Sequence, residues 1–142
     1  MSVSVLLIDD DPSAAELMSV ELSRAQFQVQ TTPSGEEGIR LLRQQPTDLV
    51  ILDLLMPRTE TWHVCKTIRL FSTVPMVVLS PLNEPAVVAA ILDAGADDYL
   101  IKPVPAALLV AHLNQLARRA GALEGAYLSG KQGAARAPRL VF

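Results

Sequence analysis

Five short apolar runs, each followed by a segment with helical periodicity, constrain the fold of this chain more than any other feature. Most of the runs are continuously apolar instead of alternating with polar residues, which indicates strands that are covered on both faces. Strands separated by single helices form right-handed parallel crossovers. We expect the strands at Val3–Ile8, Phe27–Thr31, Asp48–Asp53, Pro75–Ser80 and Asp98–Ile101.

The first helix should begin at Asp11, an N-cap residue, because Pro12 then occupies the first helical position, where proline is tolerated. We expect this helix to end near Gln26. Its inward positions should include three apolar residues, Leu17, Val20 and Leu22.

The remaining helices carry similar signals. Ser34 and Glu37 have the spacing of a capping box, which predicts a helix start ahead of three apolar residues, Ile39, Leu41 and Leu42. Further helices are expected over residues 61–71, 84–94 and 106–119, and Gly95 is a suitable residue to follow the second of these. The prediction is an α/β fold: a (βα)5 doubly wound, five-stranded parallel sheet of the flavodoxin-like type, in the order 2-1-3-4-5.

Polar side chains stand at the carboxyl ends of four of the expected strands. Asp9 and Asp10 end the first strand and Asp53 ends the third, while Ser80 ends the fourth and Lys102 follows the fifth. In sheets of this order, ligands bind at the carboxyl edge near strands 1 and 3. We therefore expect these five side chains to meet in one crevice.

Three carboxylates in one crevice require a cation. One like-charge pair about 4 Å apart costs on the order of 4 kcal/mol at an effective dielectric constant of about 20. An all-oxygen site with room for water suits Mg²⁺. An aspartate in such a site can attack phosphorus, with the metal, the lysine and the hydroxyl sharing the charge of the phosphoryl oxygens.

Taken singly, each of these residues has a plainer interpretation. Asp11 is explained by its N-cap role, and a lone aspartate, serine or lysine at a strand end is most often a solvated or locally bonded residue. Cys65 is the only cysteine, so no intrachain disulfide and no cysteine-based metal cluster can form. The case for a site therefore depends on the five residues together.

The segments LLIDDDP, DLVILDLLMP, VVLS and GADDYLIKP, in this order, resemble the receiver (CheY-like) domain of two-component response regulators. The resemblance covers residues 3–119. It implies that Asp53 is the phosphoacceptor and that Asp9, Asp10, Asp53 and the backbone carbonyl of Leu55 hold Mg²⁺. It also implies that Ser80 and Lys102 bind the phosphoryl group and that Tyr99 is a switching aromatic, although a half-buried structural aromatic explains Tyr99 equally well.

Several positions depart from the family pattern. Arg58 and Thr61 stand where the family usually has glycines, which stiffens the loop that contains Leu55. Pro81 replaces a small residue after Ser80 and restricts the backbone that must move. The aromatic common after the Lys-Pro pair is Val104. We therefore expect phosphorylation to survive and the switching step to be affected.

Three other function classes compete with a phosphorylated receiver. A pseudo-receiver would use the same fold only to bind proteins; Pro81 and Arg58 favour it, and the retained charged groups disfavour it. A flavodoxin-type cofactor site needs a hydroxyl- or glycine-rich phosphate loop where Asp9 stands. A haloacid-dehalogenase-type phosphatase needs an aspartate at the position of Leu55. The protein is expected to catalyse only its own phosphorylation and slow dephosphorylation.

Charge divides the chain into two parts. Residues 1–117 carry 14 acidic and 7 basic side chains, whereas residues 118–142 carry 1 and 5. We interpret 1–119 as a receiver domain and 120–142 as a basic Gly/Ala-rich tail or linker, the latter leading to an output domain that this sequence does not contain. DNA would be contacted only through that output domain.

Partners follow from the resemblance. It implies a sensor histidine kinase or phosphotransfer protein as phosphoryl donor. WHVCKTIR and AGADDYLIKP are most similar to OmpR/PhoB-class receivers, which pair as homodimers through the fourth helix, fifth strand and fifth helix. Asp97 and Asp98 fit that pattern, but Leu108 and His112 replace charged positions on the last helix. With no signal peptide and no membrane-length apolar run, a cytoplasmic location is expected.

Overall fold

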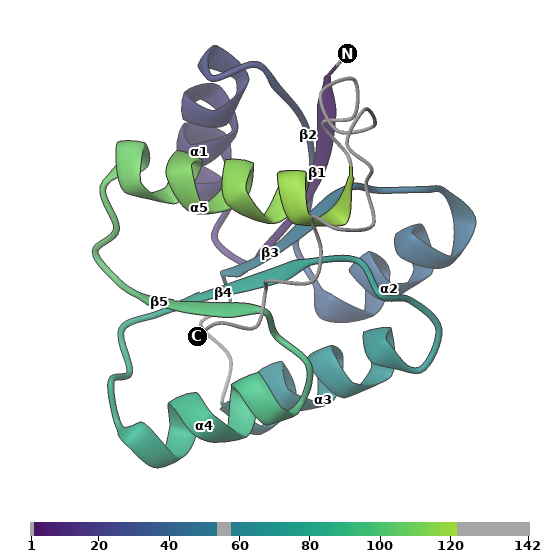
Figure 1. The fold of residues 1–142 in the computed structure, drawn as a ribbon, viewed down its shortest axis with the longest axis vertical. Helices are drawn as coiled ribbons and strands as arrows, with labels where there is room; N and C mark the ends of the chain where they lie inside the picture. The colour runs from purple at the N-terminus through teal and green to yellow at the C-terminus, as the bar shows by residue number, and fades with distance from the viewer. Residues whose placement is uncertain (1, 54–57, 122–142) are drawn as a thin grey trace.

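A central parallel sheet organises the chain, of which a computed structural model describes residues 2–53 and 58–121. All strand pairs are parallel and the strand order is β2-β1-β3-β4-β5 (Figure 1). This is the predicted topology. The strands are β1 (Val3–Asp9), β2 (Phe27–Thr32), β3 (Leu49–Asp53), β4 (Met76–Ser80) and β5 (Asp98–Ile101).

Helices cover both faces of the sheet. They are α1 (Pro12–Arg24), α2 (Gly35–Gln44), α3 (Arg58–Arg69), α4 (Pro85–Asp93) and α5 (Ala106–Ala120). In Figure 1, α1 and α5 lie on one face, and α2, α3 and α4 lie on the other. Within the described residues, no helix combines the length and apolar character needed to cross a bilayer.

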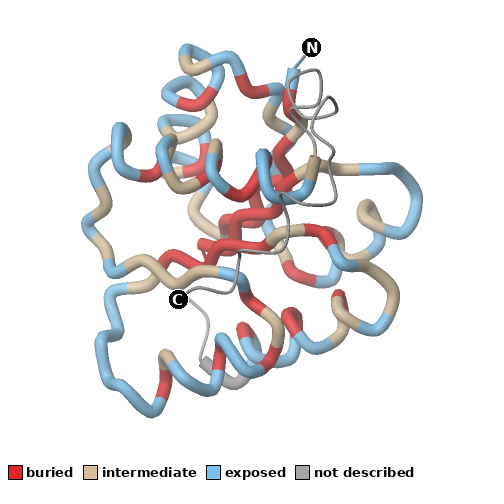
Figure 2. Tube along the Cα trace, viewed as in Figure 1, coloured by how far each residue is buried: buried red, intermediate tan, exposed pale blue. Residues whose placement is uncertain are grey.

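The two faces of the sheet form two cores because side chains alternate along each strand. From β1, Val5 and Leu7 join the core under α1 and α5, whereas Leu6 and Ile8 join the core under α2, α3 and α4. The buried residues accordingly concentrate in the central strands (Figure 2). Continuous burial on both faces explains why these strands are apolar at every position.

The helix starts predicted from Asp11 and Ser34 are confirmed. Asp11 caps α1, and its carboxylate accepts hydrogen bonds from the backbone N–H groups of Ser13 and Ala14. Ser34 caps α2 by accepting from the N–H of Glu37 at 3.1 Å. The Glu37 carboxylate pairs with Arg40. Gly95, after α4, has a φ of 126°, a conformation that favours glycine.

The predicted inner face of α1 is wrong for two residues. Leu22 is buried, but Leu17 and Val20 are exposed. The inner face instead follows Ala15, Met18 and Leu22, whose spacing of three and four residues matches the helical repeat. Leu17 and Val20 fall outside this stripe, and they face solvent.

Two helix ends also differ from prediction. Helix α1 ends at Arg24, and Gln26 has a left-handed φ of 78°, which does not continue a helix. Helix α3 spans Arg58–Arg69 instead of 61–71. Beyond its last residue, the Arg69 guanidinium donates to the carbonyls of Ser72 and Val74, and these bonds stabilise a turn where helix was expected.

Candidate phosphoacceptor site

Two buried carboxylates lie side by side at the carboxyl edge of the sheet. Asp9 ends β1 and Asp53 ends β3, and the two residues are direct partners in the register of this strand pair. Each is only 3% exposed. The parallel register therefore brings together two acids that are 44 positions apart in the sequence, as predicted.

Lys102 supplies the counter-charge. It follows β5, and its Nζ lies 2.6 Å from Oδ1 of Asp53. The backbone N–H of Lys102 donates to the carbonyl of Ser80 at 2.9 Å, which continues the pairing of β4 with β5 to this point. The ammonium is thus held by the sheet edge, and it meets Asp53 as the sequence predicted.

The carboxylate of Asp9 is only partly satisfied. Oδ1 accepts from the backbone N–H of Asp11 at 2.9 Å, but Oδ2 is buried and has no hydrogen-bond partner among the described residues. Burial raises the pKa of Asp9 from its usual 3.8 to about 6; the N–H of Asp11 opposes this rise, and the charge of Asp53 adds to it. The Asp9 carboxylate is therefore costly to ionise without a cation.

This donor set fits a hard divalent cation. Mg²⁺ usually takes one or two carboxylates and completes its shell with water and phosphate. Asp9 and Asp53 supply such a pair, and the partly exposed Asp10 follows directly. In residues 2–53 and 58–121, no three His, Cys, Asp or Glu side chains are arranged to hold a metal by themselves. The expected ligand Leu55 lies outside the described residues.

Ser80 and Tyr99 meet at a residue that the sequence did not indicate. The Ser80 hydroxyl oxygen accepts from the backbone N–H of Leu82 at 3.1 Å. The Tyr99 hydroxyl donates to the carbonyl of the same residue at 2.9 Å. Leu82 thus links the hydroxyl at the end of β4 to the aromatic ring in β5. No sequence signal marked it, since a backbone contact does not depend on side-chain identity.

Three positions that depart from the family pattern lie in α3 or directly after β4. Pro81 is exposed and lies between Ser80 and Leu82. Thr61 is buried in the first part of α3. Arg58 is the first residue of α3, and the position of its side chain lies outside what the structure describes. The expectation that Arg58 reshapes the loop stays a prediction.

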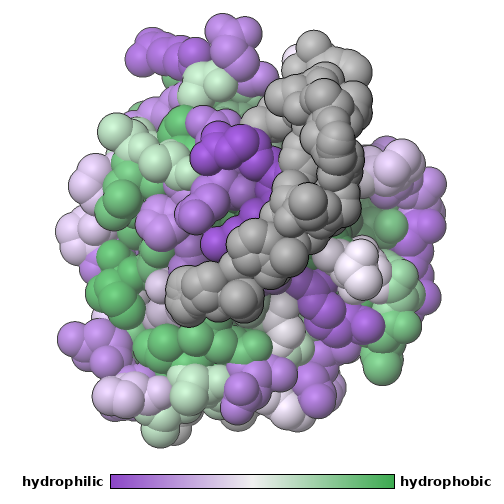
Figure 3. Space-filling model, viewed as in Figure 1, coloured by the Kyte–Doolittle hydropathy of each residue, from purple (hydrophilic) through white to green (hydrophobic). Residues whose placement is uncertain are grey.

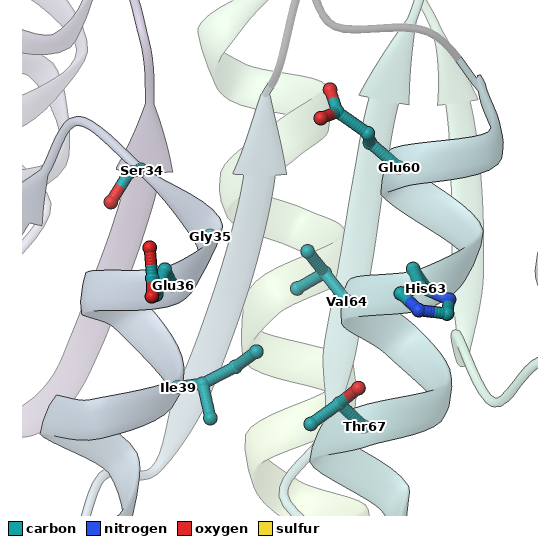
Figure 4. A pocket seen from close by; sticks show the side chains of 8 residues that line it. All are labelled: Ser34, Gly35, Glu36, Ile39, Glu60, His63, Val64 and Thr67. Atoms are coloured by element: carbon teal, nitrogen blue, oxygen red, sulfur yellow. The ribbon is translucent and has the colours of Figure 1, made fainter.

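A pocket of about 340 Å³ lies elsewhere, between α2 and α3 (Figure 4). Its apolar wall comes from Ile39 and Val64, and Glu36, Glu60 and His63 stand around it. None of the five residues predicted to form the phosphoacceptor site lines this pocket. It is therefore separate from the candidate site.

Comparison with known proteins gives matches to one family. Residues 5–114 match the family model described as "Response regulator receiver domain". The chain is 38% identical over 116 residues to the transcriptional regulatory protein AfsQ1 of Streptomyces coelicolor, a match that covers 82% of this chain and 52% of the relative. It is 35% identical over 119 residues to the DNA-binding response regulator MtrA of Mycolicibacterium smegmatis, covering 84% and 52%.

Solved structures share the fold. A two-component response regulator from Clostridium difficile superposes with a TM-score of 0.78 at 28% identity, covering 84% of this chain and 98% of that one. The receiver domain of the Francisella response regulator 1452 also gives 0.78, at 26% identity, covering 84% and 99%. The chain spans about half the length of the curated relatives it matches, whereas it matches these solved chains over nearly their whole length.

Proposed function

This chain belongs to the response regulator receiver family, and we propose that it is a phosphorylation-dependent signalling switch whose phosphoacceptor is Asp53. The observation that carries the proposal is the ion pair between Lys102 and buried Asp53, with the Asp9 carboxylate beside it. The ammonium beside this carboxylate supplies positive charge where an incoming anionic group would arrive.

The donor is a phosphohistidine on a sensor histidine kinase or a phosphotransfer protein. A carboxylate oxygen of Asp53 attacks the phosphorus, so that a P–O bond forms and the P–N bond of the donor breaks. The electrons of that bond pass to the imidazole nitrogen, which takes up a proton from water. The Lys102 ammonium, 2.6 Å from Asp53, offsets the charge that accumulates on the phosphoryl oxygens.

Asp9, Asp10 and Asp53 would hold Mg²⁺, with the carbonyl of Leu55 as the further ligand that the family implies. When bound, Mg²⁺ supplies positive charge to the carboxylates and to the phosphoryl oxygens. The buried Oδ2 of Asp9 has no hydrogen-bond partner in the part of the chain that the structure describes, and this supports the assignment because an ionised oxygen in that position needs a cation.

Leu82 connects the site to the surface. A phosphoryl group on Asp53 offers the Ser80 O–H an anionic acceptor, and rotation of the side chain towards it would move Oγ away from the Leu82 N–H from which it now accepts. Movement of Leu82 changes the carbonyl that the Tyr99 hydroxyl contacts. Phosphorylation of Asp53 would thereby alter a contact of β5 through one short loop.

The output is proposed to be transcriptional. Relatives that this chain matches over about half of their length are named transcriptional regulators, and one is named as DNA-binding. We assign DNA contact to an output domain outside residues 1–119. To the receiver domain we assign no catalysis beyond its own phosphorylation and dephosphorylation. The alternative, a pseudo-receiver, differs in a single respect: its interaction surface would not respond to a phosphoryl group.

A beryllofluoride titration tests the proposal. Beryllofluoride mimics a phosphoryl group, and Trp62 in α3 is the only tryptophan of the chain. We expect Mg²⁺-dependent, saturable changes in Trp62 fluorescence and in the amide NMR signals of Ser80, Leu82 and Tyr99. The same changes should be absent in Asp53→Asn. Binding without any change at Leu82 and Tyr99 would support the pseudo-receiver instead.

A further inference from the structure

The pocket between α2 and α3 combines an apolar floor with an acidic rim. We call it the α2–α3 groove; Ile39 and Val64 form its floor, and Glu36 and Glu60 form its rim. In Figure 4, Ile39 and Val64 point towards one another from the two helices. A Cβ at position 35 would lie 2.5 Å from Cγ2 of Val64, so Gly35 lets the start of α2 approach α3 closely.

The two rim carboxylates are available to a ligand. Glu36 of α2 and Glu60 of α3 are both exposed. Among the described residues, neither takes part in a hydrogen bond or an ion pair. His63 is the only other titratable side chain that lines the groove. The groove therefore presents two negative charges beside an apolar surface.

A second hollow, of about 430 Å³, adjoins the groove on the α2 side and shares Glu36 with it. Both of its cations are engaged within the chain: Arg40 pairs with Glu37, and the guanidinium of Arg43 lies 4.1 Å from the ring centroid of Phe71. In the space-filling view, hydrophobic and hydrophilic side chains lie next to one another over the region where Figure 1 draws α2 (Figure 3). Such a surface suits a short peptide segment with basic and apolar side chains.

The chain contains a segment of this composition outside the described residues. Positions 136–142 read RAPRLVF, with two cations, no acid and three large apolar side chains. Arg136 comes 15 positions after Gly121, and a chain of that length reaches at most about 50 Å. A domain of this size is about 35 Å across. The segment is therefore long enough to reach the α2–α3 groove.

We propose that residues 136–142 of this chain bind in its own α2–α3 groove. The two arginines of the segment face the rim carboxylates, and its apolar side chains cover the floor. Binding within one chain costs less freedom of motion than association of two molecules, so a few modest contacts suffice. This contact anchors the basic tail on the face of the sheet opposite α5, the helix that precedes it (Figure 1). The proposal does not depend on phosphorylation of Asp53.

Paramagnetic relaxation enhancement in the 142-residue chain tests the proposal. A nitroxide label is attached to the cysteine of an Ala134→Cys variant, since Cys65 is fully buried and does not react. In about 0.1 M NaCl, we expect the amide signals of Ile39 and Val64 to broaden. The amide signal of Leu17, in α1 on the opposite face, should stay sharp.

Removal of the rim charges should weaken binding. In the labelled chain, Glu36→Gln combined with Glu60→Gln should reduce the broadening at the groove at least about twofold, because two ion pairs are lost. Glu16→Gln combined with Glu21→Gln is the matched control, since it removes two exposed acids of α1. The dispersion of the amide spectrum verifies that each variant is folded.

A charge exchange separates binding from damage to the groove. Glu36→Arg combined with Glu60→Arg should remove the broadening by repulsion. Addition of Arg136→Glu and Arg139→Glu to the same chain should restore it, because opposite charges then meet again.

Each contrary result overturns the proposal. Sharp groove signals place the segment elsewhere, and equal broadening at Leu17 shows that it has no preferred site. An equal loss in the α1 control, or no recovery on charge exchange, shows that the rim charges do not hold the segment. Broadening of an unlabelled chain mixed with a labelled one shows contact between copies instead. No phosphoryl donor is present, so the assignment of Asp53 is tested separately.

Discussion

Lys102 Nζ lies 2.6 Å from Asp53 Oδ1, and this ion pair joins the end of β5 to the end of β3 across β4. We expect Lys102→Met to slow phosphorylation of Asp53 by acetyl phosphate at least about tenfold, because the ammonium stabilises charge that develops during transfer. The rate is measured by intact-mass spectrometry under saturating Mg²⁺.

Lys66→Met provides the matched control for that variant. Lys66 is an exposed lysine of α3 whose ammonium lies over the ring of Trp62. Its replacement should leave the rate unchanged. Equal rates for wild type and Lys102→Met would contradict the role assigned to this ion pair.

The raised pKa of Asp9 makes stability depend on pH in metal-free buffer. Its folded pKa of about 6 lies above the usual 3.8, so the native state binds more protons than the unfolded state between these values. Stability is therefore highest when Asp9 is protonated and falls as pH rises through this window. The loss should reach about 3 kcal/mol above pH 6. Three neighbouring charges also act on the pKa of Asp9: Asp53 and Asp10 raise it, and Lys102 lowers it.

Asp9→Asn should remove that loss. Urea unfolding in EDTA is measured near pH 4.5 and near pH 7.5. From the lower to the higher pH, we expect the free energy of unfolding of the variant to rise by about 2–3 kcal/mol relative to that of wild type. Glu16→Gln, at an exposed acid of α1, serves as the control. A variant-to-wild-type difference that is constant across this range would show that Asp9 does not titrate there.

Pro81 should restrain the loop that carries the switch. It fixes its own φ and biases Ser80 towards an extended backbone. In Pro81→Ala, we expect faster amide hydrogen exchange at Leu82 and larger beryllofluoride-induced NMR shifts at Tyr99, with an unchanged rate of Asp53 phosphorylation. Identical shifts in wild type and variant would show that Pro81 does not dampen switching.

Gln26 holds a backbone conformation that suits glycine. Its φ of 78° follows the end of α1, where glycine usually occurs. Gln26→Gly should raise the free energy of unfolding by about 1 kcal/mol, measured in urea. Gln28→Gly, at an exposed position in β2, should instead destabilise. Destabilisation by both would show that the left-handed conformation carries no cost.

The fold and the charged site could be predicted because both depend on local patterns. Continuous apolar runs marked the strands, and the parallel topology then brought Asp9, Asp53 and Lys102 to one edge. The inner face of α1 was harder to predict, because Leu17 and Val20 have the same apolar character as buried Leu22. Only packing against the sheet decides which of them turns inward.

Contacts between side chains and distant backbone were the least predictable feature. Arg69 reads as an ordinary cation at a helix end, yet it donates to the carbonyls of Ser72, Val74 and Gly95 and pairs with Asp97. The bonds of Ser80 and Tyr99 to Leu82 are similar. Such bonds depend on where a carbonyl or N–H lies after folding, and the residue type does not indicate that position.

Intact-mass spectrometry of the chain with acetyl phosphate tests the central claim most directly. We predict one phosphate adduct that requires Mg²⁺, is lost with EDTA and is absent in Asp53→Asn. An Asp48→Asn variant, which alters an acid outside the site, should keep the adduct. The absence of any adduct in wild type, or an adduct that persists in Asp53→Asn, would contradict the assignment of Asp53 as the phosphoacceptor.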